Sequence, residues 1–228
     1  MLKYYIIFSL IIISILINFN INKKISDNYY IPLKYKIREN NEHYIDLNET
    51  DKYQKEVYLF AKNIMEKYNL KKIVDVGCGS GYKLIQYLGI YETTGYETEP
   101  CISFLKKKYP NRKWINSGES EINFNEKYIS HCDLVISSDV IEHIREPNEL
   151  INFMKKFNAK YYIISTPCRE ILVKYFHRDN NGPPHNLSHV REWTFNEFKL
   201  YLNDHFKIIN SFLGKEQIEC QWHLCINK

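Results

Sequence analysis

The sequence predicts an α/β protein with a doubly wound, mostly parallel sheet of seven strands and a C-terminal antiparallel hairpin. Two observations support this fold class. From residue 50 onward, short runs rich in β-branched residues alternate with longer amphipathic segments, which is typical of parallel strands joined by helices. The last two runs, residues 207–213 and 218–226, are separated only by a short turn through Gly214, which predicts a hairpin.

The first half of the domain is expected to begin with a helix, after which strands and helices alternate. The opening helix carries its apolar residues on one face, and Thr50 could cap its start. The first strand is a β-branched run that glycines end sharply, and Pro100 suits the first turn of a later helix. The expected elements are helix 50–68, strand 73–76, helix 82–88, strand 93–97, helix 100–109 and strand 113–116.

The second half continues the alternation around one long irregular stretch, residues 166–193. Because long loops at the carboxyl ends of strands usually bind or cover ligands, we expect this insert on the substrate side. We expect its histidines His177 and His185 to be solvated, whereas both a solvated position and a place in the site are open for His189. The remaining expected elements are strand 133–138, helix 146–157, strand 161–166 and helix 194–206, before the hairpin.

Composition excludes some classes of function. The net charge of +4 is mild and gives no sign of the concentrated basic patch that nucleic-acid readers carry. The six cysteines form no CxxC pair and several lie in apolar runs, so buried free thiols are expected rather than disulfides. Around Cys220 and Cys225, strand alternation puts His223 on the face opposite Cys220, which excludes a zinc site there.

The N-terminus is a different kind of sequence. Residues 4–21 carry no charge and are long enough to cross a bilayer as a helix. No small-x-small cleavage site follows, which disfavours a signal peptide, and the segment is apolar all round, which disfavours a core helix. The basic residues that follow suggest a domain facing the cytoplasm. The expected organisation is residues 1–21 as a single-pass membrane anchor, 22–48 as a linker and 49–228 as the globular domain.

A glycine-rich turn marks the expected ligand site. Gly77, Gly79 and Gly81 follow the first strand, so they lie at the sheet edge where open α/β folds bind ligands. Glycines there let the backbone approach a ligand closely. Glu97 ends the next strand, where an acid can accept hydrogen bonds from both ribose hydroxyls. The third glycine comes one residue too early for the dinucleotide pattern, which disfavours a nicotinamide cofactor.

Four stretches, "VDVGCGSG", "GYE", "NSGESEINF" and "DLVISSDVIEH", resemble the class I S-adenosylmethionine-dependent methyltransferases (type 11/12-like domains), from about residue 50 to the C-terminus. The resemblance implies a Rossmann-like fold and S-adenosyl-L-methionine as the cofactor. It implies that the glycine loop lies against the methionine part, that Glu97 holds the ribose and that Glu119 approaches the adenine amine. Asp75 matches the family's acid in the first strand. The implied cofactor-binding residues are Asp75, Gly77, Cys78, Gly79, Gly81, Glu97, Glu119 and Asp139.

The stretch "SSDVIEH" holds the catalytic candidates. If the backbone turns helical at Asp139, then Asp139, Glu142 and His143 share one face, whereas an extended backbone points Glu142 away. The acid-x-x-Glu-His pattern resembles that of ubiquinone-biosynthesis O-methyltransferases and small-RNA 2′-O-methyltransferases, where it holds a divalent ion, and "HVREW" adds His189. Three roles stay open: a structural or cofactor-shell role, His143 as a general base, or a Mg or Mn site at Asp139, Glu142, His143 and His189.

The predicted function is a membrane-anchored, S-adenosylmethionine-dependent methyltransferase that methylates an oxygen of a small molecule, a glycan or a lipid-linked acceptor. Its catalytic candidates are His143, Glu142 and His189. One alternative is a metal-dependent RNA 2′-O-methyltransferase, although nucleic acid is a disfavoured partner. Another is a non-catalytic, membrane-tethered cofactor-binding or interaction domain, against which the intact glycine turn and Glu97 argue. The sequence does not identify the methyl acceptor.

Overall fold

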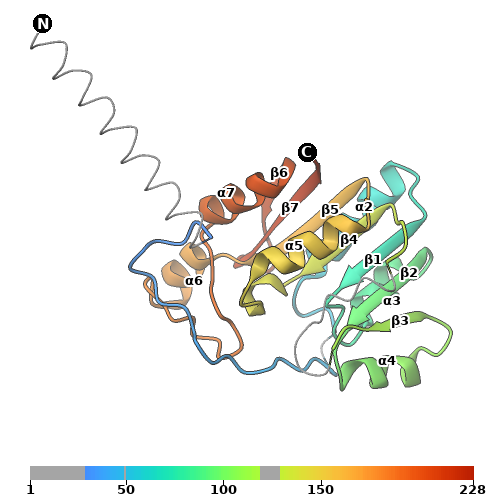
Figure 1. Ribbon diagram of the computed structural model, residues 1–228, viewed down its shortest axis with the longest axis horizontal. Coiled ribbons are helices and arrows are strands. Elements are labelled where there is room, and N and C mark those ends of the chain that lie inside the picture. Colours follow the sequence, from blue (N-terminus) through green and yellow to red (C-terminus); the bar gives the residue numbers. More distant parts are fainter. Residues whose placement is uncertain (1–28, 49, 119–128) are drawn as a thin grey trace, which may run out of the picture.

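The computed structural model describes residues 29–48, 50–118 and 129–228, which form one seven-stranded sheet with helices on both faces (Figure 1). The strand order is β3-β2-β1-β4-β5-β7-β6. β7 runs antiparallel to β5 and β6, and the other neighbouring strands are parallel. The predicted fold, a Rossmann-like, doubly wound and mostly parallel sheet with a C-terminal antiparallel hairpin, is confirmed.

The strands of the sheet coincide with the runs that the sequence predicts. Their bounds are β1 Lys72–Val76, β2 Glu92–Glu97, β3 Lys113–Asn116, β4 Leu134–Ser138, β5 Tyr161–Pro167, β6 Phe206–Leu213 and β7 Cys220–Asn227. β1 lies between β2 and β4, with Val74 opposite Thr94 on one side and Val135 on the other. All residues of β4 are buried, as expected for a central parallel strand that helices cover on both faces.

Helices form one layer on each face of the sheet. Val57 of α2, Leu84 of α3 and Ile102 of α4 belong to the apolar core on one face. Leu150 of α5 and Phe198 of α7 belong to the core on the other face. The helices are α2 Lys55–Lys67, α3 Tyr82–Leu88, α4 Cys101–Lys108, α5 Pro147–Lys156, α6 Arg169–Phe176 and α7 Phe195–His205, with a 3₁₀ turn, η2, at Ile141–His143.

Two local predictions are wrong. α2 begins at Lys55 rather than at residue 50, because Gln54 before it has a left-handed backbone (φ 62°) and no side chain caps the helix. Part of the insert that the sequence predicts as a loop is α6. Arg169 at the start of α6 is buried, and its Nη2 donates to both carboxylate oxygens of Glu197 at 2.6 and 2.7 Å. This contact joins segments far apart in the chain, so the local pattern cannot reveal it.

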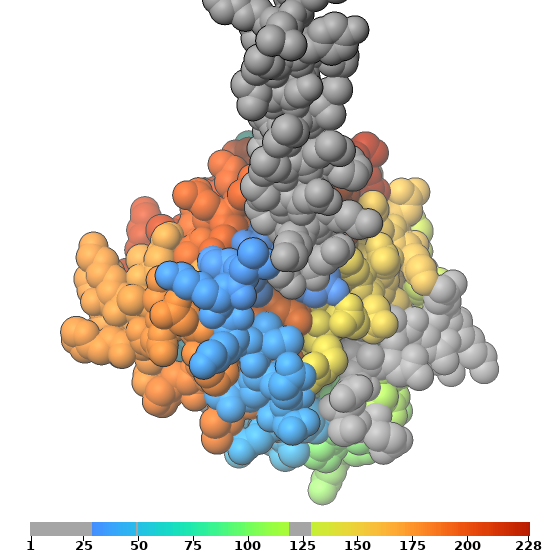
Figure 2. All heavy atoms as spheres, turned by 60° about the vertical axis from the view of Figure 1, so that its left-hand side comes forward, coloured from blue at the N-terminus to red at the C-terminus, as the bar shows by residue number. Residues whose placement is uncertain are grey.

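Residues 29–48, here called the strap, pack along the insert, and Figure 2 shows the two side by side on the surface in blue and orange. Ile31 and Tyr35 of the strap are buried in the core. The backbone N–H groups of Lys36 and Arg38 donate to carbonyls of the insert at 2.7 and 2.8 Å. This part of the predicted linker therefore lies on the domain, while the domain boundary at residue 49 stays a prediction.

The predicted membrane anchor, residues 1–21, lies outside the described residues. Within the ranges that the structure describes, no helix is both long enough and apolar enough to span a bilayer. The anchor and the cytoplasmic orientation of the domain therefore stay predictions.

Candidate active site

A cavity of about 350 Å³ opens where β1, β2 and β4 end, at the carboxyl edge of the sheet. The loops that follow these strands line it, together with the strap and the start of α2. Its volume lies within the range of small-molecule sites, roughly 300–1,000 Å³. The lining residues on which the site depends are Gly77, Cys78, Gly79, Lys83, Glu97, Asp139 and His143.

The glycine loop after β1 has a backbone that favours glycine. The φ angles of Gly77, Gly79 and Gly81 are 81°, 53° and 69°, all in the left-handed region. A Cβ atom on Gly79 would lie 2.3 Å from Oδ2 of Asp46 in the strap. The Gly79 N–H donates to Oε2 of Glu97 at 2.6 Å, which ties the loop to the end of β2. A side chain at position 79 would therefore need a strained backbone and a shift of the Asp46 side chain.

The two acids at the ends of β1 and β2 differ in their relation to the cavity. Glu97 lines it, its Oε1 accepts from the Thr98 N–H at 2.8 Å, and burial raises its pKa. Asp75 is not part of the lining; it is fully buried and accepts from the Tyr58 hydroxyl at 2.8 Å. Burial raises the pKa of Asp75 to about 7. The ribose role of Glu97 stays a prediction, and Glu119 lies outside the described residues.

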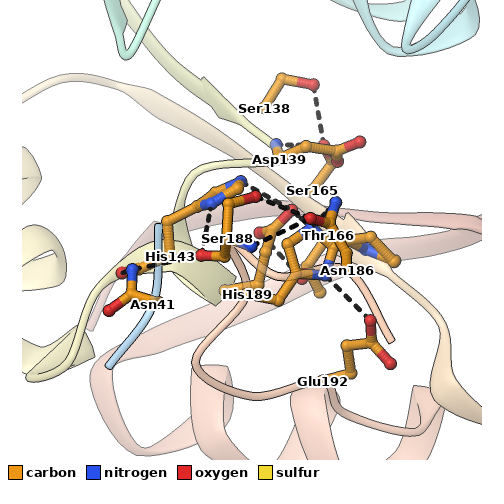
Figure 3. Close-up of polar contacts among 12 residues, drawn as sticks. Asn41, Ser138, Asp139, His143, Ser165, Thr166, Asn186, Ser188, His189 and Glu192 are labelled. Carbon is orange, nitrogen blue, oxygen red and sulfur yellow. Dashed lines mark hydrogen bonds and ion pairs between the residues drawn. The ribbon is translucent and has the colours of Figure 1, made fainter. Parts of the chain in front are cut away.

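Asp139 forms its hydrogen bonds with residues other than the catalytic candidates. It follows β4 with a left-handed backbone (φ 53°), and the 3₁₀ turn η2 follows instead of an α-helix. Its carboxylate accepts from Ser165 Oγ at 2.6 Å and from Gln54 Nε2 at 2.9 Å. Figure 3 shows Asp139 beside Ser165 and apart from His143. The face that a helical turn at Asp139 would give is therefore not formed, and the prediction of Asp139 as a metal ligand is wrong, because it is not in the group of described residues that could hold a metal.

Glu142, His143 and His189 do come together, with one possible ligand atom from each within 4.8 Å of the others. The Nε2 atoms of His143 and His189 lie 3.9 and 4.0 Å from Oε1 of Glu142. Glu142 is fully buried, and its Oε2 accepts from Thr166 Oγ1 at 3.0 Å. Among the described residues, its Oε1 has no hydrogen-bond partner. Because a buried oxygen without a donor is costly, the arrangement fits a cation bound between the three side chains.

Hydrogen bonds on the far side of each imidazole assign its tautomer. His143 Nδ1 lies 2.9 Å from the carbonyl of Ser188, which can only accept, so this nitrogen carries the proton. His189 Nδ1 lies 2.8 Å from Oε1 of Glu192, which likewise accepts from it. The Asn186 amide donates to His189 Nε2 at 3.0 Å. His143 Nε2 therefore has a free lone pair, as metal ligands do, whereas the lone pair of His189 Nε2 accepts from Asn186, which would have to turn away for His189 to bind a cation.

Burial disfavours proton transfer by His143, and for Glu142 it favours the protonated carboxyl, whose proton a cation would have to displace. Burial lowers the pKa of His143 to about 3, so its imidazole is neutral at neutral pH. A neutral imidazole can bind a cation, but a group with so low a pKa is a weak general base. Burial and the charge of Asp139 raise the pKa of Glu142 well above its usual range. Tyr44 of the strap stacks on His143 with ring centroids 5.6 Å apart.

Of the three histidines in the insert, His189 lies in the group with Glu142 and His143, whereas part of the cavity wall was not predicted. His177 and His185 are exposed, as expected, and lie in neither the cavity lining nor the His–Glu group. The sequence does not predict that strap residues line the cavity, because residues 22–48 have no clear hydrophobic period. The position of Lys83 does carry a signal in the sequence, because Lys83 shares the buried side of α3 with Leu84 and Leu88.

A comparison with known protein families supports a cofactor site in this cavity. A family model described as a methyltransferase domain (Methyltransf_23) matches residues 45–219, and the chain belongs to this family. It is therefore an S-adenosylmethionine-dependent methyltransferase of class I, as its glycine loop and strand-end acids indicate. No curated protein matches the chain.

Solved structures share the fold. The methyltransferase domain of bacterial CtHen1-C is 21% identical with a TM-score of 0.58, over 76% of this chain and 98% of that one. The small RNA methyltransferase HEN1 is 20% identical with a TM-score of 0.59, over 83% of this chain and 27% of that one. Magnesium protoporphyrin IX methyltransferase (ChlM) from Synechocystis PCC 6803 is 14% identical with a TM-score of 0.58, over 77% of this chain and 84% of that one. At these identities the likeness shows the fold alone.

Proposed function

We propose that the chain methylates an oxygen of a small molecule, a glycan or a lipid-linked acceptor, next to a divalent cation held by Glu142, His143 and His189. One observation carries the proposal: candidate ligand atoms of Glu142, His143 and His189 lie within 4.8 Å of one another, beside the cavity that His143 also lines. The cation site and the cofactor site are therefore adjacent. Two imidazoles and one carboxylate suit a manganese-like ion better than magnesium, which prefers oxygen ligands.

When bound, S-adenosyl-L-methionine supplies an electrophilic methyl group. The chain's own groups bind and orient it. Gly77 and Gly79 let the backbone approach the ligand, and the Glu97 carboxylate is the acceptor proposed for the ribose hydroxyls. The strap covers part of the cavity with Asp46 and Tyr44, which helps to exclude water. In-line positioning of acceptor and cofactor supplies much of the rate.

The charge around the cavity supports a neutral or cationic acceptor. Glu42, Glu146 and Glu149 line the cavity and are exposed. The one exposed cation in the lining among the described residues is Arg145, whose guanidinium is ion-paired with Glu39 at 3.1 Å. A rim of this kind repels a phosphate backbone.

A metal-dependent RNA 2′-O-methyltransferase is the second candidate. Its support is the Glu142–His143–His189 group together with the likeness to a structure named as a small RNA methyltransferase. The acidic rim argues against it. Short RNA offered as a methyl acceptor beside glycans and small hydroxylated molecules separates the two, because faster transfer to RNA would displace the leading proposal.

We also propose that residues 1–21 anchor the chain in a membrane, with the domain on the cytoplasmic side. The uncharged run of residues 4–21 supports this. The Tyr29 hydroxyl donates to Glu146, which lines the cavity, so the described chain begins beside the rim. Residues 22–28 span at most about 25 Å when extended, which would keep the cavity near the membrane surface and suits a lipid-linked acceptor. Protease protection of the domain in sealed membrane vesicles tests the orientation, and a soluble full-length chain would contradict the anchor.

Transfer of a labelled methyl group tests the catalytic proposal. The full chain is incubated with labelled cofactor and an acceptor panel, with manganese or with a chelator. We expect transfer that needs the metal and is lost in His143→Ala and His189→Ala but kept in His185→Ala, a matched change of an exposed histidine in the insert. Transfer that is unchanged in the chelator would rule out the cation.

A further inference from the structure

Lys83 places a buried positive charge in the wall of the cofactor cavity. It lies in the first turn of α3, lines the cavity and is only 7% exposed. The other cationic lysine or arginine among the described lining residues is Arg145, which is exposed and ion-paired with Glu39. Lys83 is therefore the cation that a ligand inside the cavity would meet.

The contacts of Lys83 leave its charge without a close counterion in the described part of the chain. Its Nζ donates to the backbone carbonyl of Thr50 at 3.2 Å and lies 5.8 Å from the centre of the Tyr58 ring. Its charge lowers the pKa of the buried Asp75, but the hydrogen bond that Asp75 accepts comes from Tyr58. A buried ammonium normally needs an anionic partner, because leaving water is costly for a charge.

The other charged groups of the cavity indicate what that partner is. Asp46, Glu97 and Asp139 line the cavity with Lys83 and would attract the positive groups of a ligand and repel its negative ones. S-adenosyl-L-methionine carries a sulfonium, an ammonium and one carboxylate, so the carboxylate is its only anionic group. Among the described lining residues, charge complementarity therefore favours a site for this carboxylate beside Lys83.

We propose that the ammonium of Lys83 binds the amino-acid carboxylate of the cofactor, which makes Lys83 a cofactor-binding residue of this chain. The inference rests on the chain's use of S-adenosyl-L-methionine but not on the acceptor or on the cation. A purely structural role, in which Lys83 only holds the Thr50 carbonyl, is the competing explanation.

A pair of ligands separates the two roles. S-adenosylhomocysteine keeps the carboxylate, whereas 5′-methylthioadenosine keeps the adenosine and thioether and lacks the whole amino-acid part. Calorimetry compares both ligands on the full chain, on Lys83→Met and on Lys62→Met, a control at a partly exposed lysine of α2 outside the cavity lining. Because a hydrogen bond to a charged group is a strong one, we expect Lys83→Met to bind S-adenosylhomocysteine about 10- to 100-fold more weakly.

The expected pattern is selective for the ligand. Affinity for 5′-methylthioadenosine should stay within about twofold in Lys83→Met, which also shows that the variant is folded, and Lys62→Met should match the parent chain for both ligands. An equal loss of affinity for both ligands, or no loss for either, would overturn the role of Lys83. Failure of the parent chain to bind either ligand would instead contradict the cofactor itself.

Discussion

Replacing Glu192 with alanine should weaken divalent-cation binding although all three proposed ligands remain. Glu192 is buried, and its Oε1 accepts from Nδ1 of His189 at 2.8 Å, on the side of the ring opposite the proposed cation. This bond fixes the tautomer in which Nε2 carries the lone pair that a cation needs. A buried hydrogen bond to a charged acceptor is stronger than one between neutral groups. Loss of a residue that hydrogen-bonds to a metal ligand typically lowers metal affinity about 10- to 100-fold.

Manganese titration followed by electron paramagnetic resonance measures this change without any acceptor. We expect Glu192→Ala to raise the manganese Kd about 10- to 100-fold and Glu192→Gln to raise it less, because glutamine keeps an acceptor oxygen but loses the charge. Glu170→Ala, a change of an exposed acid in the same insert, should leave the Kd unchanged. An unaltered Kd in Glu192→Ala, with the variant folded by circular dichroism, would refute the reasoning.

Three further predictions concern the cofactor loop, the buried acid and the cap of α7. Gly79→Ala would place a Cβ 2.3 Å from the Asp46 carboxylate at φ 53°, so we expect at least tenfold weaker S-adenosylhomocysteine binding and about 1–2 kcal/mol lower stability, measured by calorimetry and urea unfolding; unchanged binding would contradict the close packing. Burial raises the pKa of Asp75 to about 7, above the value near 3.9 of an unfolded aspartate, so the folded state holds this proton more tightly. The free energy of unfolding should therefore fall between about pH 4 and pH 7, and Asp75→Asn should flatten that slope; identical slopes would contradict it. Thr194 accepts from the Glu197 N–H at 3.3 Å in a capping box, so Thr194→Ala should cost about 1 kcal/mol and lower the Tm, whereas an unchanged Tm would show the cap to be redundant.

The sheet could be predicted because its signals are local. Each strand is a short apolar run bounded by glycine or polar residues, and the helices between the strands follow a helical period. α6 was not predictable in this way, because its first residue, Arg169, is fixed by Glu197 from a later segment. The strap is hidden for a similar reason, since isolated anchors such as Ile31 and backbone hydrogen bonds hold it to the insert.

The candidate site could be predicted only where a residue's role depends on its place at a strand end. Glu97 and the glycine loop lie at the cavity because both directly follow or end strands. The spacing of Asp139, Glu142 and His143 suggested one helical face, but the left-handed backbone at Asp139 and the following 3₁₀ turn separate the first acid from the pair. The contact of His143 with His189 crosses 46 positions in the chain and depends on how the insert folds back.

The most direct test of the cation site is the electron spin-echo spectrum of manganese bound to the full chain with S-adenosylhomocysteine. We expect nitrogen modulation from two imidazoles, reduced in His143→Ala and in His189→Ala and kept in His185→Ala. A spectrum of manganese surrounded by oxygen alone, equal in all four proteins, would contradict a cation held by Glu142, His143 and His189.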